Sequence, residues 1–85
     1  MDVSAVTGGE RTKHVVDATG LSCPLPVIEL SKAVERAAVG DLVELTATDP
    51  AARVDVAVWC RMQRHVLHEV SEERRGWRFV VERVR

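Results

Sequence analysis

Apolar and polar positions along the chain predict four short strands and two helices. The first β-rich run covers residues 13–18, and the second, 41–48, alternates in part between apolar and polar side chains. Two further runs, 65–71 and 77–84, flank the polar segment 72–76 and predict a hairpin. Apolar residues at a spacing of three and four follow each of the first two runs. The predicted order is therefore βαβαββ.

Both predicted helices have start and stop signals. The first follows Leu21–Pro26 (Leu-Ser-Cys-Pro-Leu-Pro) and stops at Gly40. The second begins at Asp49-Pro50, because aspartate can cap free amides and proline is tolerated at the first helical position. It runs to about Met62. One stripe of this helix is made of Val54, Ala57, Val58 and Arg61.

The chain length and the start of the sequence indicate one domain with a leader. Residues 1–12 contain a Gly-Gly pair and no apolar periodicity, so we expect a flexible leader there. Residues 13–85 are then a single domain, and a chain of 85 residues can build only one thin core.

The predicted order places both helix starts at one edge of the sheet. A helix that crosses between the first two strands makes them parallel, so the carboxyl ends of these strands meet at the same edge. Cys23 and Asp49 lie at those two helix starts. We therefore expect them to face each other across a shallow crevice, where ligand chemistry in open α/β sheets tends to gather.

Composition and charge exclude several classes of protein. The chain has two Trp, one Phe and no Tyr, which argues against a stacking surface for single-stranded nucleic acid. A net charge of -1 gives no reason to expect a polyanionic partner. No apolar run approaches the ~20 residues that cross a bilayer, and the N-terminus lacks the features of a signal peptide. We expect a cytoplasmic protein in a reducing compartment.

Cys23 is the candidate reactive residue. Pro24 and Pro26 flank the helix start, where their missing amides cost least, and they stiffen the backbone that holds the cysteine outward. The positive end of a helix dipole favours an anion, so we expect a lowered Cys23 pKa and a thiolate that can attack sulfur. The predicted geometry contains no base, metal set or oxyanion hole. These features favour a carrier that passes sulfur on over an enzyme that transforms a small molecule.

The segment around Cys23 resembles a known family. Leu21–Pro26 is similar to the CPxP signature of the TusA/SirA/YedF sulfur carriers and sulfurtransferases. The resemblance extends over residues 13–85, and its other matching segments are Asp17–Leu21, Thr48–Pro50, Asp55-Val56 and Trp59-Cys60. A CPxP motif after a strand, with an Asp-Pro helix start about 25 residues later, is a specific combination.

The resemblance implies a fold and an activity. The fold class is α+β, a two-layer α/β sandwich with two helices on one face of a four-stranded mixed sheet. Cys23 would take persulfide sulfur from a cysteine desulfurase or rhodanese-type donor and hand it to an acceptor protein. Such sulfur serves tRNA thiolation, molybdenum-cofactor maturation or sulfur metabolism in the family. The persulfide is covalent, so no cofactor is expected, and a transient transfer needs only a monomer or weak dimer.

Two other functions, and a role for Cys60 as a second reactive cysteine, are alternatives. One is a non-catalytic interaction or regulatory module that uses the crevice for binding, and the other is a thiol redox protein. The redox hypothesis is weakened because the chain has no C-x-x-C pair. Cys60 is expected to pack in the core, and a resolving disulfide with Cys23 is the lesser alternative.

The remaining polar and aromatic candidates have simpler structural interpretations. Asp49 matches an acidic position beside the family motif, but it is first a helix cap, and its charge would oppose a thiolate. His65 and His68 are three apart on a predicted strand, which places them on opposite faces and argues against a shared metal site. The two tryptophans are expected to pack in the core or at the edge, and Arg74-Arg75 to form a solvated hairpin tip that could help dock an acidic partner.

Overall fold

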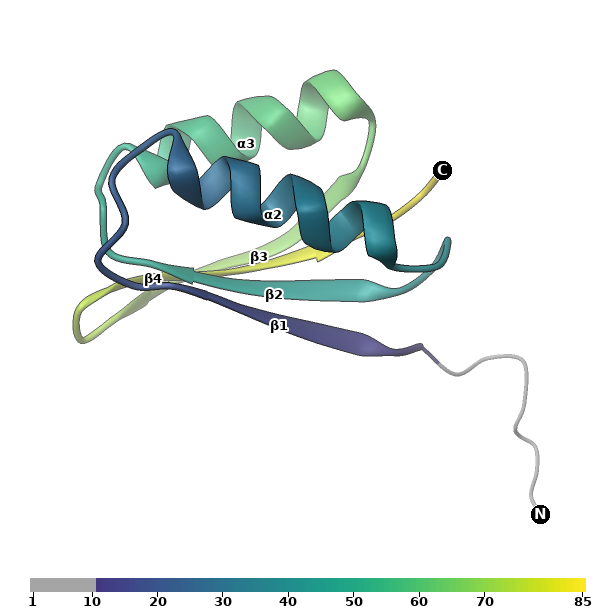
Figure 1. Cartoon of the computed structure of the whole chain (residues 1–85), viewed down its shortest axis with the longest axis horizontal. Helices are drawn as coiled ribbons and strands as arrows, with labels where there is room; N and C mark the ends of the chain where they lie inside the picture. The colour runs from purple at the N-terminus through teal and green to yellow at the C-terminus, as the bar shows by residue number, and fades with distance from the viewer. Residues whose placement is uncertain (1–10) are drawn as a thin grey trace, which may run out of the picture.

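The computed structural model describes residues 11–85 as two helices packed on a four-stranded sheet. The predicted leader, residues 1–12, falls almost entirely outside the described residues. Both helices lie on one face of the sheet (Figure 1), which confirms the α+β two-layer sandwich and the order βαβαββ. The elements are β1 (Lys13–Ala18), α2 (Leu25–Arg36), β2 (Leu42–Ala47), α3 (Ala52–Gln63), β3 (Val66–Glu73) and β4 (Gly76–Glu82).

The strands are arranged in the order β1-β2-β4-β3. β1 and β2 are parallel, as the intervening helix requires, and Val16 pairs with Leu45 in their register. β4 runs antiparallel to both β2 and β3. The sheet is therefore mixed, and the carboxyl ends of β1 and β2 lie at the same edge, where both helices begin (Figure 1).

Alternating burial along the strands builds the core between sheet and helices. In β2, Val43, Leu45 and Ala47 are fully buried, while the residues between them are only partly covered. Phe79 is the largest fully buried side chain and lies opposite Leu45 on the neighbouring strand. This period-2 pattern is what the sequence predicted for a sheet covered by helices on one face.

The stripe of Val54, Ala57, Val58 and Arg61 is not the buried face of α3. Val54 and Val58 are exposed, whereas the buried residues of this helix are Ala52, Val56 and Cys60. The helix is apolar around much of its circumference, so its sequence did not single out one face. The prediction that Cys60 packs in the core is confirmed, because its side chain is 2% exposed.

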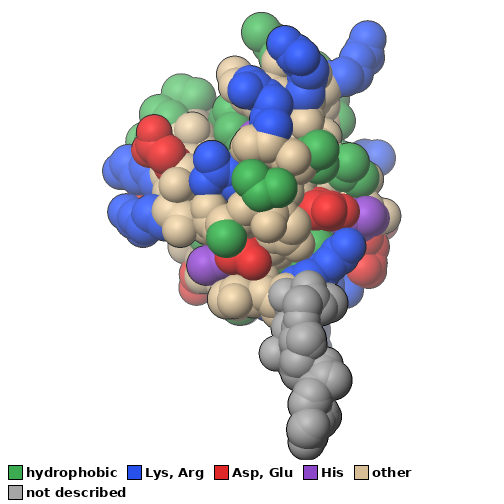
Figure 2. Space-filling model, turned by 90° about the vertical axis from the view of Figure 1, so that its right-hand side faces the viewer, with side chains coloured by type: hydrophobic (Ala, Val, Ile, Leu, Met, Phe, Trp, Pro, Cys, Tyr) green, Lys and Arg blue, Asp and Glu red, His purple; other side chains and the backbone are tan. Residues whose placement is uncertain are grey.

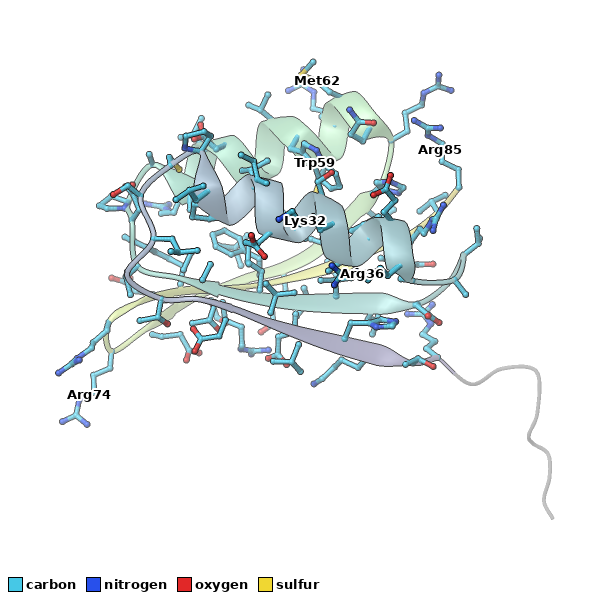
Figure 3. The ribbon with its side chains drawn as sticks, in the orientation of Figure 1. Lys32, Arg36, Trp59, Met62, Arg74 and Arg85 are labelled. Carbon is cyan, nitrogen blue, oxygen red and sulfur yellow. The ribbon has the colours of Figure 1, made fainter. Side chains whose placement is uncertain are left out.

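The hairpin between β3 and β4 turns through Arg74-Arg75, whose side chains are exposed as expected; Figure 3 shows Arg74 pointing away from the sheet. Gly76 follows with a φ of 132°, a region that side chains rarely adopt. A Cβ atom there would overlap the carbonyl oxygen of Ala47. Only glycine lets the hairpin pass this close to β2.

The sheet face opposite the helices carries charged side chains. Arg78 of β4 donates hydrogen bonds to Glu44 at 2.8 Å and to Glu69 at 2.9 Å, and Lys13 pairs with Glu44 at 3.2 Å. Each of these pairs is at least partly solvated, so its net contribution to stability is small.

Neither of the two helices within residues 11–85 is long and apolar enough to cross a membrane.

Candidate functional site

Cys23 lies in the turn that joins β1 to α2. Pro24 is the N-cap residue of the helix, so Cys23 stands one residue before the cap. The Cys23–Pro24 peptide bond is cis. Pro26 is buried in the first helical turn, and Cys23 itself is half-buried against the core. The thiol is thus held at the rim of the molecule by a backbone that two prolines and core packing restrain.

Asp49 connects this turn to the start of α3. Its Oδ2 accepts a hydrogen bond from the backbone amide of Cys23 at 2.8 Å, and its Oδ1 accepts one from the amide of Ala51 at 3.0 Å. The predicted juxtaposition of the two helix starts is therefore confirmed. The helix itself begins later than predicted, at Ala52, since Pro50 and Ala51 form a turn that the Asp49 side chain stabilises.

Asp55 is a neighbour of the thiol that the sequence did not identify as part of the site. It lies in the first turn of α3, directly across from Cys23. The only signal for it in the sequence was its place in the Asp55-Val56 pair that resembles the family pattern. The expectation of a site without a base is corrected here, because a carboxylate stands within hydrogen-bonding reach of the thiol.

The predicted lowering of the Cys23 pKa is wrong. Hydrogen bonding of the thiol to Asp55, partial burial, and the negative charges of Asp55 and Asp49 raise the pKa of Cys23 to about 11. Both carboxylates disfavour a further negative charge beside them. The pKa of Asp49 is itself lowered, because the amides of Cys23 and Ala51 donate to its carboxylate, so its charge persists at neutral pH.

The start of α2 offers the thiolate few compensating donors. Pro24 and Pro26 have no amide hydrogen, and the amide of Leu25 donates to the carbonyl of Ser22 at 2.9 Å. At this helix N-terminus two of the amides that usually stabilise an anion are therefore absent, and that of Leu25 is already used. At rest Cys23 is a neutral thiol.

An apolar groove of about 260 Å³ lies between the two helices, and its lining includes Pro24 and Asp55, the neighbours of Cys23. Trp59 and Met62 lie along α3 on the side that borders it (Figure 3). Met62 is 72% exposed, an unusual position for a large apolar side chain. The groove is lined by Pro24, Val27, Asp55, Val58, Trp59 and Met62.

The other candidate residues serve the fold. Burial raises the pKa of the Cys60 thiol to about 11, which leaves it protonated and inert in the core. Trp59 and Trp77 are half-buried and pack against the core, as predicted. His68 pairs with Glu82 at 2.7 Å. Among residues 11–85, no three His, Cys, Asp or Glu side chains come together as metal ligands would.

Comparison with known proteins identifies the family. A family model described as sulfurtransferase TusA matches residues 14–83. This chain belongs to the TusA family. The match includes the Cys23 turn, both helices and almost the whole sheet.

Relatives and a solved structure agree with the TusA assignment. A candidate sulfur carrier protein from Archaeoglobus fulgidus is 37% identical over 84% of this chain and 97% of its own length. The sulfur carrier protein TusA of Pseudomonas putida strain GB-1 is 42% identical over 69% of this chain and 74% of its own. A SirA-like protein from Desulfitobacterium hafniense has a similar crystal structure, with a TM-score of 0.68 and 26% identity, over 80% of this chain and 92% of that one. As a TusA sulfur carrier, the protein takes part in sulfur relay between donor and acceptor proteins.

Proposed function

We propose that Cys23 is the residue that carries sulfur, as a covalent persulfide, and that no further cofactor takes part. The position of the two thiols supports this assignment. Cys23 is half-exposed and lies next to Pro24 and Asp55, which line the groove, whereas Cys60 is 2% exposed in the core. A partner's reactive sulfur can reach only the first of them without unfolding the helix pair.

The proposed step is a thiol exchange at the terminal sulfur of a donor persulfide. The sulfur of Cys23 attacks that terminal atom, a new S–S bond forms at Cys23, and the S–S bond of the donor breaks. The donor leaves as a thiol and Cys23 becomes a persulfide, so one sulfur atom moves with no net oxidation. The Asp55 carboxylate, which stands close to the Cys23 thiol, accepts its proton during the attack and passes it to the departing donor thiolate.

The donor in this proposal is a cysteine desulfurase or a rhodanese-type protein, and it docks along the apolar groove. The acceptor belongs to the machinery of tRNA thiolation, molybdenum-cofactor maturation or sulfur metabolism. Nucleic acid and membranes are not direct partners in this scheme, and the relay is cytoplasmic, where thiols stay reduced. A weakly associating monomer suits a carrier that must release each partner after transfer.

Intact-protein mass spectrometry tests the proposal directly. The protein is incubated with a cysteine desulfurase, pyridoxal phosphate and L-cysteine, beside Cys23→Ser and Cys60→Ala variants. We expect the wild type and Cys60→Ala to gain one sulfur atom, which a reductant removes, and Cys23→Ser to gain none. A folded wild-type protein that alkylates at Cys23 yet gains no sulfur from several donors would favour the interaction-module hypothesis.

A further inference from the structure

A second cavity lies at the opposite end of the helix pair from Cys23. It has a volume of about 200 Å³, well above the ~10–15 Å³ that one water molecule needs. Figure 2 shows this end of the molecule, where Lys and Arg side chains gather on its upper part. The cavity is lined by Ser31, Val34, Glu35, Trp59, Gln63, His65, Arg83 and Arg85.

Two arginines of this cavity are held by helix carbonyls through only part of their guanidinium groups. Arg83 uses Nη1 on the carbonyls at the end of α2 and Nε on the Arg85 carbonyl, and Arg85 uses Nε on the carbonyl of Gln63 at 2.9 Å. These bonds fix both side chains and satisfy the negative ends of the two helices. Nη2 of Arg83 and both Nη atoms of Arg85 donate no hydrogen bond to residues 11–85.

His65 adds a neutral donor to the same cavity. Its Nδ1 accepts a hydrogen bond from the backbone amide of Val84 at 3.1 Å, so the ring proton is on Nε2. The ring also lies 5.6 Å from that of Trp59, which closes one wall. Burial and the charges of Arg85 and Arg83 lower the pKa of His65, so the imidazole stays neutral near pH 7.

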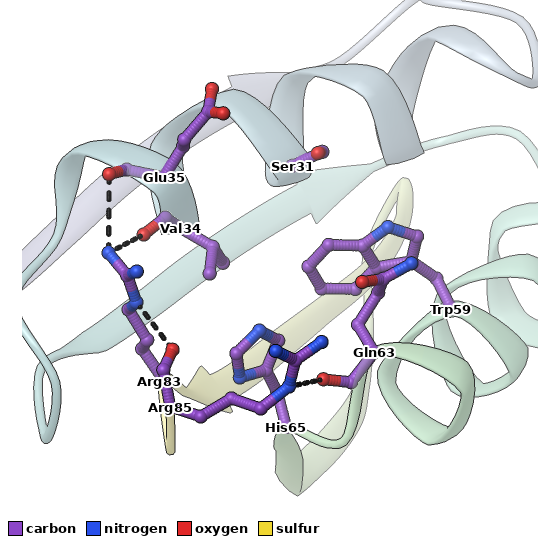
Figure 4. Close-up of a pocket in the computed structure, with 8 residues that line it drawn as sticks. All are labelled: Ser31, Val34, Glu35, Trp59, Gln63, His65, Arg83 and Arg85. Atoms are coloured by element: carbon purple, nitrogen blue, oxygen red, sulfur yellow. Dashed lines mark hydrogen bonds between the residues drawn. The ribbon is translucent and has the colours of Figure 1, made fainter.

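The cavity therefore has an excess of hydrogen-bond donors and positive charge. Neither Arg83 nor Arg85 forms an ion pair with an Asp or Glu side chain among residues 11–85. Glu35 is the one acidic residue of the lining, and Figure 4 shows its carboxylate turned away from Arg85. In the same view the Arg85 guanidinium lies beside His65 and the Gln63 side chain, under the Trp59 ring.

We propose that this cavity binds a small tetrahedral oxyanion, of the phosphate or sulfate class. The donors belong to the end of α3, the residue just before β3 and the chain after β4, so they approach from several sides. A tetrahedral dianion has acceptor oxygens in all these directions, whereas a planar carboxylate has them in one plane. Two guanidinium groups with no Asp or Glu partner among residues 11–85 match its charge.

Trp59 provides a direct readout of binding. A Trp77→Phe variant leaves Trp59 as the single tryptophan, and its fluorescence is titrated with sodium phosphate, sodium sulfate, sodium acetate and sodium chloride at equal ionic strength and pH 7.5. We expect a saturable change with phosphate and sulfate, and none with chloride. Equal responses to chloride would overturn the site, and acetate binding as tight as phosphate would overturn the tetrahedral class.

Two arginine variants in this background locate the site. Arg85→Gln removes a guanidinium from the cavity, and Arg74→Gln removes one from the exposed hairpin tip. We expect the first to weaken phosphate binding about tenfold, the value of a charge-assisted hydrogen-bond pair, and the second to leave it unchanged. Equal affinity in both variants would refute the assignment. Circular dichroism melting of each variant confirms that it is folded before the titration is compared.

Discussion

The side chain of Asp49 holds the backbone of Cys23: its Oδ2 lies 2.8 Å from the amide nitrogen of a residue 26 positions earlier in the chain. The other carboxylate oxygen caps the turn that leads into α3. One aspartate therefore joins the two helix starts and fixes where the reactive thiol stands. The same carboxylate also opposes ionisation of that thiol, where its charge adds to the larger effects of Asp55 and of burial on the pKa of Cys23.

Asp55→Asn should make Cys23 more reactive at rest. The substitution removes the largest cause of the raised pKa, the hydrogen bond and charge of the carboxylate, so the pKa of Cys23 falls from about 11. Each unit of decrease raises the thiolate fraction at pH 8 about tenfold. The rate of iodoacetamide alkylation as a function of pH measures this shift. Asp17→Asn, the same chemical change on β1, should leave the profile in place; equal profiles for wild type and Asp55→Asn would contradict the prediction.

Asp49→Ala should destabilise the fold by about 1–2 kcal/mol, because two backbone amides lose their acceptor and one of them is partly buried. Urea unfolding followed by circular dichroism measures the difference. Asp17→Ala is the matched control, since Asp17 also accepts an amide hydrogen bond two residues along, at 3.0 Å from Thr19, but connects no distant segments. A loss no larger than in this control would argue against the bridging role.

Val58→Glu should impair sulfur uptake from a donor protein. The rate of Cys23 alkylation should fall by less than severalfold. Val58 lines the same groove as Pro24 and Asp55, and a carboxylate there would have to be desolvated when an apolar partner surface docks. Val70→Glu on β3 is an equally exposed control, at 45% against 46% for Val58. Persulfide formation with a desulfurase measures uptake. Equal uptake in the two variants would place donor docking elsewhere.

Protonation of His65 in mild acid should lower the free energy of unfolding. Burial, Arg85 and Arg83 lower the pKa of His65 below its ordinary 6.5, so the unfolded chain binds the proton more readily. Neutral His65 contributes fully to stability above pH 6.5. This contribution is lost as the pH falls through the lowered pKa that His65 has in the folded protein. Urea unfolding at pH 7.5 and pH 5.5 tests this.

We expect the drop between these two pH values to shrink in His65→Gln, which still offers an acceptor to the Val84 amide. The idea fails if His65→Gln loses as much stability as the wild type over this interval.

Local patterns were sufficient for the elements and the motif. Alternation along β2 and spacing of three and four along α2 report which side chains face a core, and these depend only on neighbours in the chain. The CPxP turn likewise identified Cys23 as the candidate reactive residue. The parallel pairing of β1 and β2 placed Asp49 beside it.

Two features of the site depended on contacts between distant segments. α3 has apolar residues around most of its surface, so only its packing on the sheet decided that Val56 and Cys60 are buried and that Val58 borders the groove. The sign of the Cys23 pKa shift was decided in the same way. A pKa reflects charges a few ångströms away in space, and Asp55 is 32 positions away in sequence. Motif and periodicity identified the cysteine, but folding brought to it the carboxylates that keep it protonated.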